Sequence, residues 1–133
     1  MNKVKRIVAS LAATVTVGAV SLSAAAYSDP PFDVSISYNS YKWSKPATKE
    51  DNSNKAGVHA RGGNVSSQSP VYVTIYSKQR LGNVDRVSGT IYLNKNKQDK
   101  DIFYTDTFSP NNSYYLLFET GAYSATVSGF WNP

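Results

Sequence analysis

Alternation of apolar and polar residues is the feature that most constrains the fold of this chain. Residues 32–38 read FDVSISY, so Phe32, Val34, Ile36 and Tyr38 share one face, and the Asp and Ser residues between them share the other. A period of two is the signature of a half-buried β-strand, whose successive side chains point to opposite sides of a sheet. The same pattern predicts further strands in the segments 71–76, 86–93, 101–108, 113–120 and 123–131.

The phase of each run predicts which side chains enter the core. Gly89 interrupts one run and predicts a bulge or a tight contact. At the C-terminus, Trp131 falls on the inward face and completes the core, whereas Phe130 points to the other side of the sheet. The predicted inward set consists of the residues of 32–38 named above and of Val71, Val73, Ile75, Val87, Ile91, Leu93, Tyr114, Leu116, Phe118, Tyr123, Ala125, Val127 and Trp131.

Turn-forming stretches separate the runs and set the fold class. The longest polar stretch, 44–57, predicts a single mobile loop, and 58–60 predicts an additional short strand. No window after residue 26 shows a helical period. Short strands at this spacing predict an all-β domain: a single antiparallel β-sandwich of six or seven strands, formed by residues 27–133.

Residues 1–26 have the features of a cleaved signal peptide. Lys3, Lys5 and Arg6 precede an apolar run over 7–22, and Ala24-Ala25-Ala26 supplies the small residues of a cleavage site. The run of about 16 residues is shorter than the ~20 that span a bilayer, so an uncleaved membrane anchor is the weaker alternative. Cleavage is expected after Ala26, and the mature protein is expected to be secreted or held at the cell surface.

Loss of this segment lowers the net charge. The chain carries 14 basic and 9 acidic residues and a net charge of +5, but three of the basic residues and none of the acidic ones lie in 1–26. The mature chain is therefore near +2, which argues against a nucleic-acid partner. The absence of cysteine means that packing and hydrogen bonds hold the exported domain together, which favours a Gram-positive bacterium as its source.

The inventory of reactive side chains argues against catalysis. His59 is the only histidine and there is no cysteine, so a nucleophilic triad or a zinc site lacks its usual residues. We expect no catalytic residue, no cofactor and no metal site. A glycosidase-like pair drawn from Asp85, Asp106 and Glu119 is retained as an alternative, because that chemistry needs only two carboxylates.

Aromatic residues are the most informative excess. All ten tyrosines, five phenylalanines and two tryptophans lie after residue 26. Some of them occupy the face opposite the aliphatic side chains, where a one-sided sheet exposes them. We interpret these as a candidate binding platform for a glycan, a peptide or a membrane surface; the alternative is that they serve only the stability of the strands. The platform residues are Tyr72, Tyr76, Tyr92, Tyr115 and Phe130.

The C-terminal stretch YSATVSGFWNP resembles the closing signature of a family of small secreted Gram-positive proteins, a domain of unknown function. Tyr123, the run 126–129, Phe130 and Trp131 match that signature in order, and DRVSG at 85–89 is similar to its middle segment. The Asn-Pro tail departs from the family pattern, and the stretch 44–55 has no counterpart in it. The resemblance implies secretion and a β-rich domain, and it carries over no catalytic residue.

These features together predict a secreted, non-catalytic β-sandwich that binds a cell-envelope or extracellular partner. The alternative function is a bacteriocin-like antimicrobial or membrane-active protein, because small size, export and exposed aromatics fit that as well. An enzyme is the third hypothesis.

Overall fold

The computed structural model describes residues 29–78, 84–106 and 108–133, so the predicted signal peptide lies outside the described residues. This part of the chain is all-β and contains no helix. Its strands are β1 (Pro31–Ile36), β2 (Tyr41–Trp43), β3 (Ala47–Thr48), β4 (Lys55–Gly63), β5 (Val71–Lys78), β6 (Val84–Leu93), β7 (Gln98–Phe103), β8 (Ser113–Glu119) and β9 (Ala125–Asn132).

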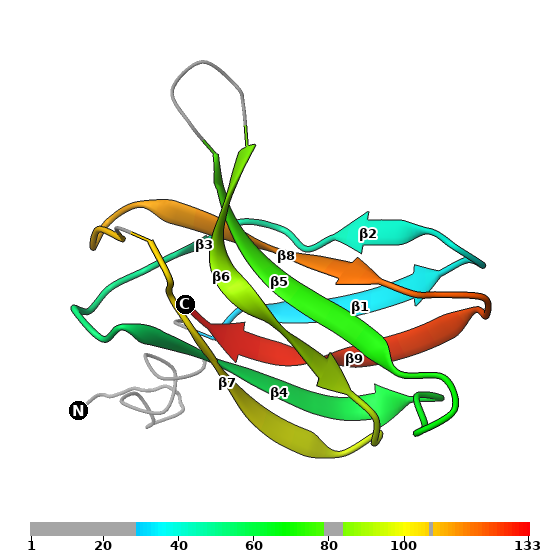
Figure 1. Ribbon diagram of the computed structural model, residues 1–133. Coiled ribbons are helices and arrows are strands. Elements are labelled where there is room, and N and C mark those ends of the chain that lie inside the picture. The colour runs from blue at the N-terminus through cyan, green and yellow to red at the C-terminus, as the bar shows by residue number, and fades with distance from the viewer. Residues whose placement is uncertain (1–28, 79–83, 107) are drawn as a thin grey trace, which may run out of the picture. The chain divides into compact units, whose positions relative to one another are not determined.

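The strands form two antiparallel sheets, which Figure 1 shows as two layers. One sheet has the order β1-β9-β4-β7. The other has the order β2-β8-β5-β6, with β3 paired to β8 beside β2. The predicted antiparallel β-sandwich is confirmed. The strand number exceeds the predicted six or seven because β2 and β3, with three and two residues, are too short to show a period in the sequence.

The core between the sheets has the predicted phase. Val73, Ile75, Leu116 and Phe118 are fully buried from one sheet, and Trp131 of β9 is fully buried from the other. Because successive residues of a pleated strand alternate between faces, most of the predicted apolar set lies in the interior.

Two predicted inward residues do not reach the core. Tyr123 precedes β9 and is only partly buried, and its hydroxyl donates a hydrogen bond to the Pro70 carbonyl at 2.7 Å. Tyr38 follows the end of β1 at Ile36 and is 62% exposed. Asn39 then adopts a left-handed backbone with φ of 48°, which turns the chain towards the other sheet. The alternation of apolar and polar residues in the sequence therefore continues two residues beyond the end of the strand.

The stretch 44–57 is not the single mobile loop that its polar composition predicts. It contains β3 and the start of β4, and Ser44, Ala47 and Lys49 are buried. The Ser44 hydroxyl accepts a hydrogen bond from the Leu116 amide at 2.9 Å, so a polar side chain extends the pairing of β8 where β2 ends. Polar residues in this stretch are thus held by specific partners inside the fold.

Lys49 is the most unusual of these residues because its side chain is fully buried. Its Nζ lies 2.8 Å from an oxygen of Asp51, and 5.0 and 5.2 Å from the ring centroids of Tyr104 and Phe108. A cation over aromatic faces is stabilised by their negative charge density. The hydrogen bond from Lys49 holds the pKa of the Asp51 carboxyl below its ordinary value.

The predicted irregularity at Gly89 is a bulge. The register between β5 and β6 shifts between Thr74 opposite Thr90 and Tyr76 opposite Arg86. At the shift, the Ser88 hydroxyl accepts a hydrogen bond from the Ile75 amide at 2.8 Å and so replaces a missing backbone partner. A Cβ built on Gly89 meets nothing within 4 Å, which rules out the alternative of a tight contact.

Candidate functional site

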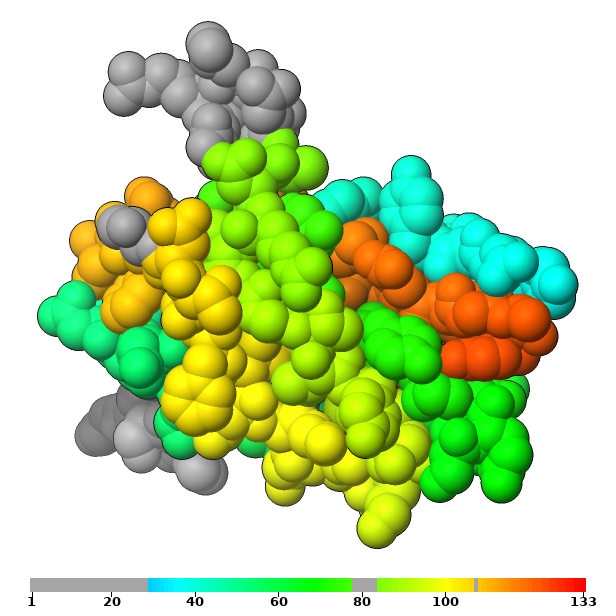
Figure 2. All heavy atoms as spheres, in the orientation of Figure 1, coloured from blue at the N-terminus to red at the C-terminus, as the bar shows by residue number. Residues whose placement is uncertain are grey.

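The outer surface of the β2-β8-β5-β6 sheet carries a group of aromatic side chains, which we call the aromatic face. In Figure 2 the cyan atoms of β2, the orange atoms of β8 and the green atoms of β5 and β6 lie side by side on the surface in view. Its rings are those of Tyr41, Trp43, Tyr72, Tyr76, Tyr92 and Tyr115.

Strand register aligns part of this face in a row that crosses the sheet. Tyr41 lies opposite Glu119, Glu119 lies opposite Tyr72, and Tyr72 lies opposite Tyr92. Directly paired residues project on the same side of a sheet, so one side chain from each of the four strands stands in line. We call this line the tyrosine row. It covers three inter-strand spacings, roughly 14 Å.

The tyrosine row is exposed to solvent. Tyr41 is 59%, Tyr92 49% and Tyr72 40% exposed, and Glu119 is also exposed. The rings of Tyr72 and Tyr92 are tilted by 60° with centroids 6.3 Å apart. At the β6 end, Nζ of Lys100 lies 5.1 Å from the Tyr92 ring centroid, so a cation covers part of that ring.

A second aromatic cluster lies beside the row. Trp43 meets Tyr76 edge to face with centroids 5.2 Å apart and Tyr115 in the same manner at 6.4 Å. Leu117, opposite Trp43, is buried, as is Thr74 in the next strand. Edge-to-face contacts stabilise aromatic pairs, so these rings are held in place before any partner arrives.

An open depression with a volume of about 340 Å³ lies at the β2 edge of the aromatic face. Tyr41 and Trp43 contribute aromatic surface, and their rings are 80° to one another. Glu119 contributes a carboxylate. The volume falls in the range of small ligand sites, and the mixture of rings and a few polar groups is typical of them. The lining residues are Asn39, Ser40, Tyr41, Trp43, Leu117, Glu119 and Thr120.

Four of the five predicted platform residues, Tyr72, Tyr76, Tyr92 and Tyr115, lie on the aromatic face. Phe130 does not, because it lies on the outer surface of the opposite sheet, in β9. The sequence reasoning missed Tyr41 and Trp43. Their strand has three residues, all exposed, so no alternation marked it. The aromatic spacing of the YKW triplet was the only available signal.

Phe130 belongs to a separate polar cluster on β4, β7 and β9. Its ring stacks on His59 with centroids 4.8 Å apart, and the Arg61 guanidinium carbon lies 5.2 Å from its centroid. Asp99 faces both side chains: one of its oxygens is 2.8 Å from Nδ1 of His59 and 2.7 Å from the Arg61 guanidinium. The hydrogen bond with His59, and then that from Arg61, hold the Asp99 pKa below its ordinary value.

This pKa shift predicts an acid-dependent contribution to stability. The ionised Asp99 stabilises the fold above the carboxyl's ordinary pKa of 3.8, and the contribution is lost as pH falls through the lower folded-state pKa. We expect Asp99→Asn to lower the thermal midpoint slightly at pH 7, since the pair is solvent-exposed, and to lower it less at pH 2. An equal deficit at both pH values contradicts an ionic origin.

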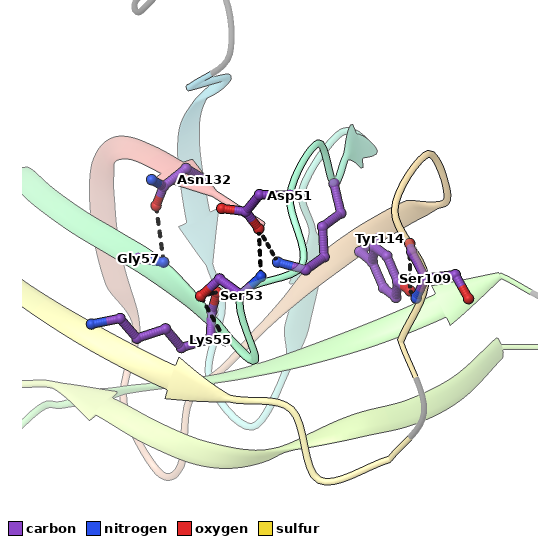
Figure 3. A network of polar contacts seen from close by, with 8 residues as sticks. Asp51, Ser53, Lys55, Gly57, Ser109, Tyr114 and Asn132 are labelled. Carbon is purple, nitrogen blue, oxygen red and sulfur yellow. Dashed lines mark hydrogen bonds and ion pairs between the residues drawn. The ribbon is translucent and has the colours of Figure 1, made fainter.

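A second depression, of about 280 Å³, lies near the end of β9 and the start of β4. Figure 3 shows the polar contacts around it: the Gly57 amide donates to the Asn132 side chain, and Asp51 accepts from the Ser53 amide. Lys55 pairs with Asp101 at 2.7 Å. These groups already bond one another, so this depression is organised for stability at the end of the sheet.

The carboxylates considered for a glycosidase pair are not all brought together. Asp85 lies opposite Ser77, whereas Glu119 lies opposite Tyr72, five positions away along β5. That offset is roughly 17 Å, beyond the ~5–10 Å such a pair requires. Asp106 follows β7. In the described residues, no three His, Asp or Glu side chains cluster closely enough to hold a metal ion.

No family model, curated protein or solved structure matches this chain. Across residues 29–78, 84–106 and 108–133, no helix has the length and apolar character needed to span a membrane. The aromatic face is therefore characterised by its own geometry alone.

Proposed function

We propose that the chain is a secreted, non-catalytic binding protein that attaches to the cell envelope through the aromatic face. The observation that carries the proposal is the alignment of Tyr41, Tyr72 and Tyr92 in one exposed row across four strands. Contiguous exposed apolar surface on a small domain is typical of an interaction site.

The rigidity of the face supports the same function. Trp43, Tyr76 and Tyr115 are fixed by mutual ring contacts on a paired sheet. A surface already held in its binding conformation loses little conformational entropy when a partner arrives. Tyrosine and tryptophan also combine apolar contact area with a hydrogen-bonding group, which suits a wet, polar partner.

Membrane activity of the bacteriocin kind is the second candidate function. Exposed Tyr and Trp side chains are typical of proteins that insert into the membrane interface. The Glu119 carboxylate in the tyrosine row and Arg86 in β6, opposite Tyr76, place charges on the same face and oppose deep insertion. Leakage of dye from anionic vesicles, weakening as salt rises, would favour this function over attachment.

Attachment is tested by retention of the mature protein on purified cell walls. We expect the double variant Tyr72→Ser/Tyr92→Ser to be retained at least about tenfold less than wild type, because each lost ring contact contributes on the order of 1 kcal/mol. Phe103→Ser is the matched control, since Phe103 is an aromatic that is 55% exposed on β7 of the other sheet. Thermal unfolding establishes that each variant is folded.

Two results contradict the proposal. One is a folded double variant that is retained as well as wild type. The other is equal loss in the double variant and in Phe103→Ser, which assigns retention to general hydrophobicity. If the same face captures a soluble extracellular protein and the walls do not retain the domain, the partner is that protein and not the cell envelope.

A further inference from the structure

The tyrosine row contains one group whose chemistry restricts the partner. Glu119 stands between Tyr41 and Tyr72, is exposed, and also lines the 340 Å³ depression. Within the described residues its carboxylate takes part in no hydrogen bond or ion pair. An ionised carboxylate only accepts hydrogen bonds, so a ligand that covers it has to bring donors.

The surroundings of Glu119 add to this requirement. Asn39 and Ser40 line the same depression, and their side chains make no hydrogen bond within the described residues. An amide and a hydroxyl each donate and accept. The depression thus offers aromatic surface from Tyr41 and Trp43 beside polar groups of both kinds, without a cluster of like charges.

Resting on the proposed function, we infer that the tyrosine row and its depression bind a neutral, hydroxyl-rich, linear glycan. The apolar face of a sugar ring stacks on an aromatic ring, and its hydroxyls donate to a carboxylate and exchange hydrogen bonds with amides and alcohols. The row of roughly 14 Å matches an extended ligand of several sugar units. The depression holds one unit, and Tyr72 and Tyr92 contact the units that follow.

Other ligand classes fit this surface less well. A lipid acyl chain or an unbroken run of prolines covers Glu119 without supplying donors, and a buried unpaired carboxylate is costly. An ammonium ion fits only the depression, between Tyr41, Trp43 and Glu119, and leaves Tyr72 and Tyr92 uncovered. An anionic polymer is repelled by the negative charge of Glu119.

The test is a titration of the mature full-length domain with three neutral hexasaccharides: chitohexaose, cellohexaose and isomaltohexaose. Binding is followed by calorimetry and by tryptophan fluorescence. Trp43 is 39% exposed and lines the depression, whereas Trp131 is fully buried and serves as an internal reference. We expect saturable binding of at least one hexasaccharide with a change in the Trp43 emission.

Two substitutions locate the site. Glu119→Gln keeps the shape of the side chain and removes its charge, and we expect affinity to fall about tenfold, since hydrogen bonds to charged groups are the stronger ones. Tyr41→Ala removes stacking in the depression and is expected to cost a similar factor. Phe103→Ala, on the other sheet, is expected to bind as wild type.

Three comparison probes complete the design: tetramethylammonium chloride, decaproline and phosphatidylglycerol vesicles. Binding of one of these with no binding of a hexasaccharide overturns the glycan assignment, and so does hexasaccharide binding that is unchanged by both substitutions.

If walls retain the protein through Tyr72 and Tyr92 but no hexasaccharide binds or competes, the glycan inference fails while the attachment function stands. If hexasaccharides bind at the row but wall retention is unaffected by Tyr72→Ser/Tyr92→Ser, the attachment function fails instead.

Discussion

Replacing Trp131 with alanine is expected to remove about 3–5 kcal/mol of folding stability, the range found for deletion of large buried aromatics. The side chain is fully buried and stands opposite Val58 in the centre of its sheet. A domain of this size has only about 5–15 kcal/mol in total. The thermal midpoint should therefore fall on the order of 20 °C, measured by circular dichroism.

The neighbouring residue provides the matched control for this prediction. Phe130 is half-buried and packs on His59 and Arg61 at the surface, so Phe130→Ala is expected to cost about 1 kcal/mol. Trp131→Phe keeps an aromatic in the core and gives a folded intermediate case. If Trp131→Ala costs no more than Phe130→Ala, the indole does not complete the core.

Replacing Gly129 with alanine is expected to destabilise the fold by about 1–3 kcal/mol or more, as overpacking does in other cores. A Cβ at this position would collide with the backbone carbonyl of His59 and lie 3.0 Å from the Phe32 ring. The carbonyl belongs to the paired strand β4, so no side-chain rotation relieves the contact and the two central strands have to move apart.

Gly89→Ala tests the same change where the structure leaves room. A Cβ on Gly89 meets nothing within 4 Å, so the variant should be neutral or slightly stabilised because alanine restricts the unfolded chain. Urea unfolding of both variants measures the difference. Equal effects at Gly89 and Gly129 would contradict the close approach of β9 to β4.

The positions of Trp131 and Gly129 account in physical terms for part of the C-terminal stretch. Val127 and Trp131 enter the core, Gly129 permits close strand pairing, and Phe130 packs outside on β4. Four of the five residues of VSGFW therefore have a structural role. A binding role for this stretch is not needed to account for its aromatic pair.

Local alternation was sufficient to predict most of the core. In 71–76 and 113–118 the pleat of the strand forces every second side chain inward, so a period of two in the sequence becomes a buried face. Tyr38 and Tyr123 were misplaced because alternation alone does not locate where a strand ends or begins. β2 and β3 were missed because two or three residues carry no measurable period.

Features that depend on pairing between distant segments could not be predicted. The tyrosine row exists because β2 and β5 flank β8 in one register, which brings Tyr41 and Tyr72 to either side of Glu119. The phase of each strand indicated which tyrosines face outward, but only the register shows which of them are neighbours. Phe130 was correctly predicted to point outward. It was grouped with the tyrosines because the sequence does not show that its strand belongs to the opposite sheet.

Acrylamide quenching of tryptophan fluorescence, with and without sonicated cell-wall fragments, tests the role of the aromatic face most directly. In the free protein, Trp43 should be quenched and the buried Trp131 should not. On addition of wall fragments, the account predicts that Trp43 becomes protected while Trp131 is unchanged. Wall-bound protein in which Trp43 remains as accessible to acrylamide as in solution would show that attachment uses another surface, and would contradict the account.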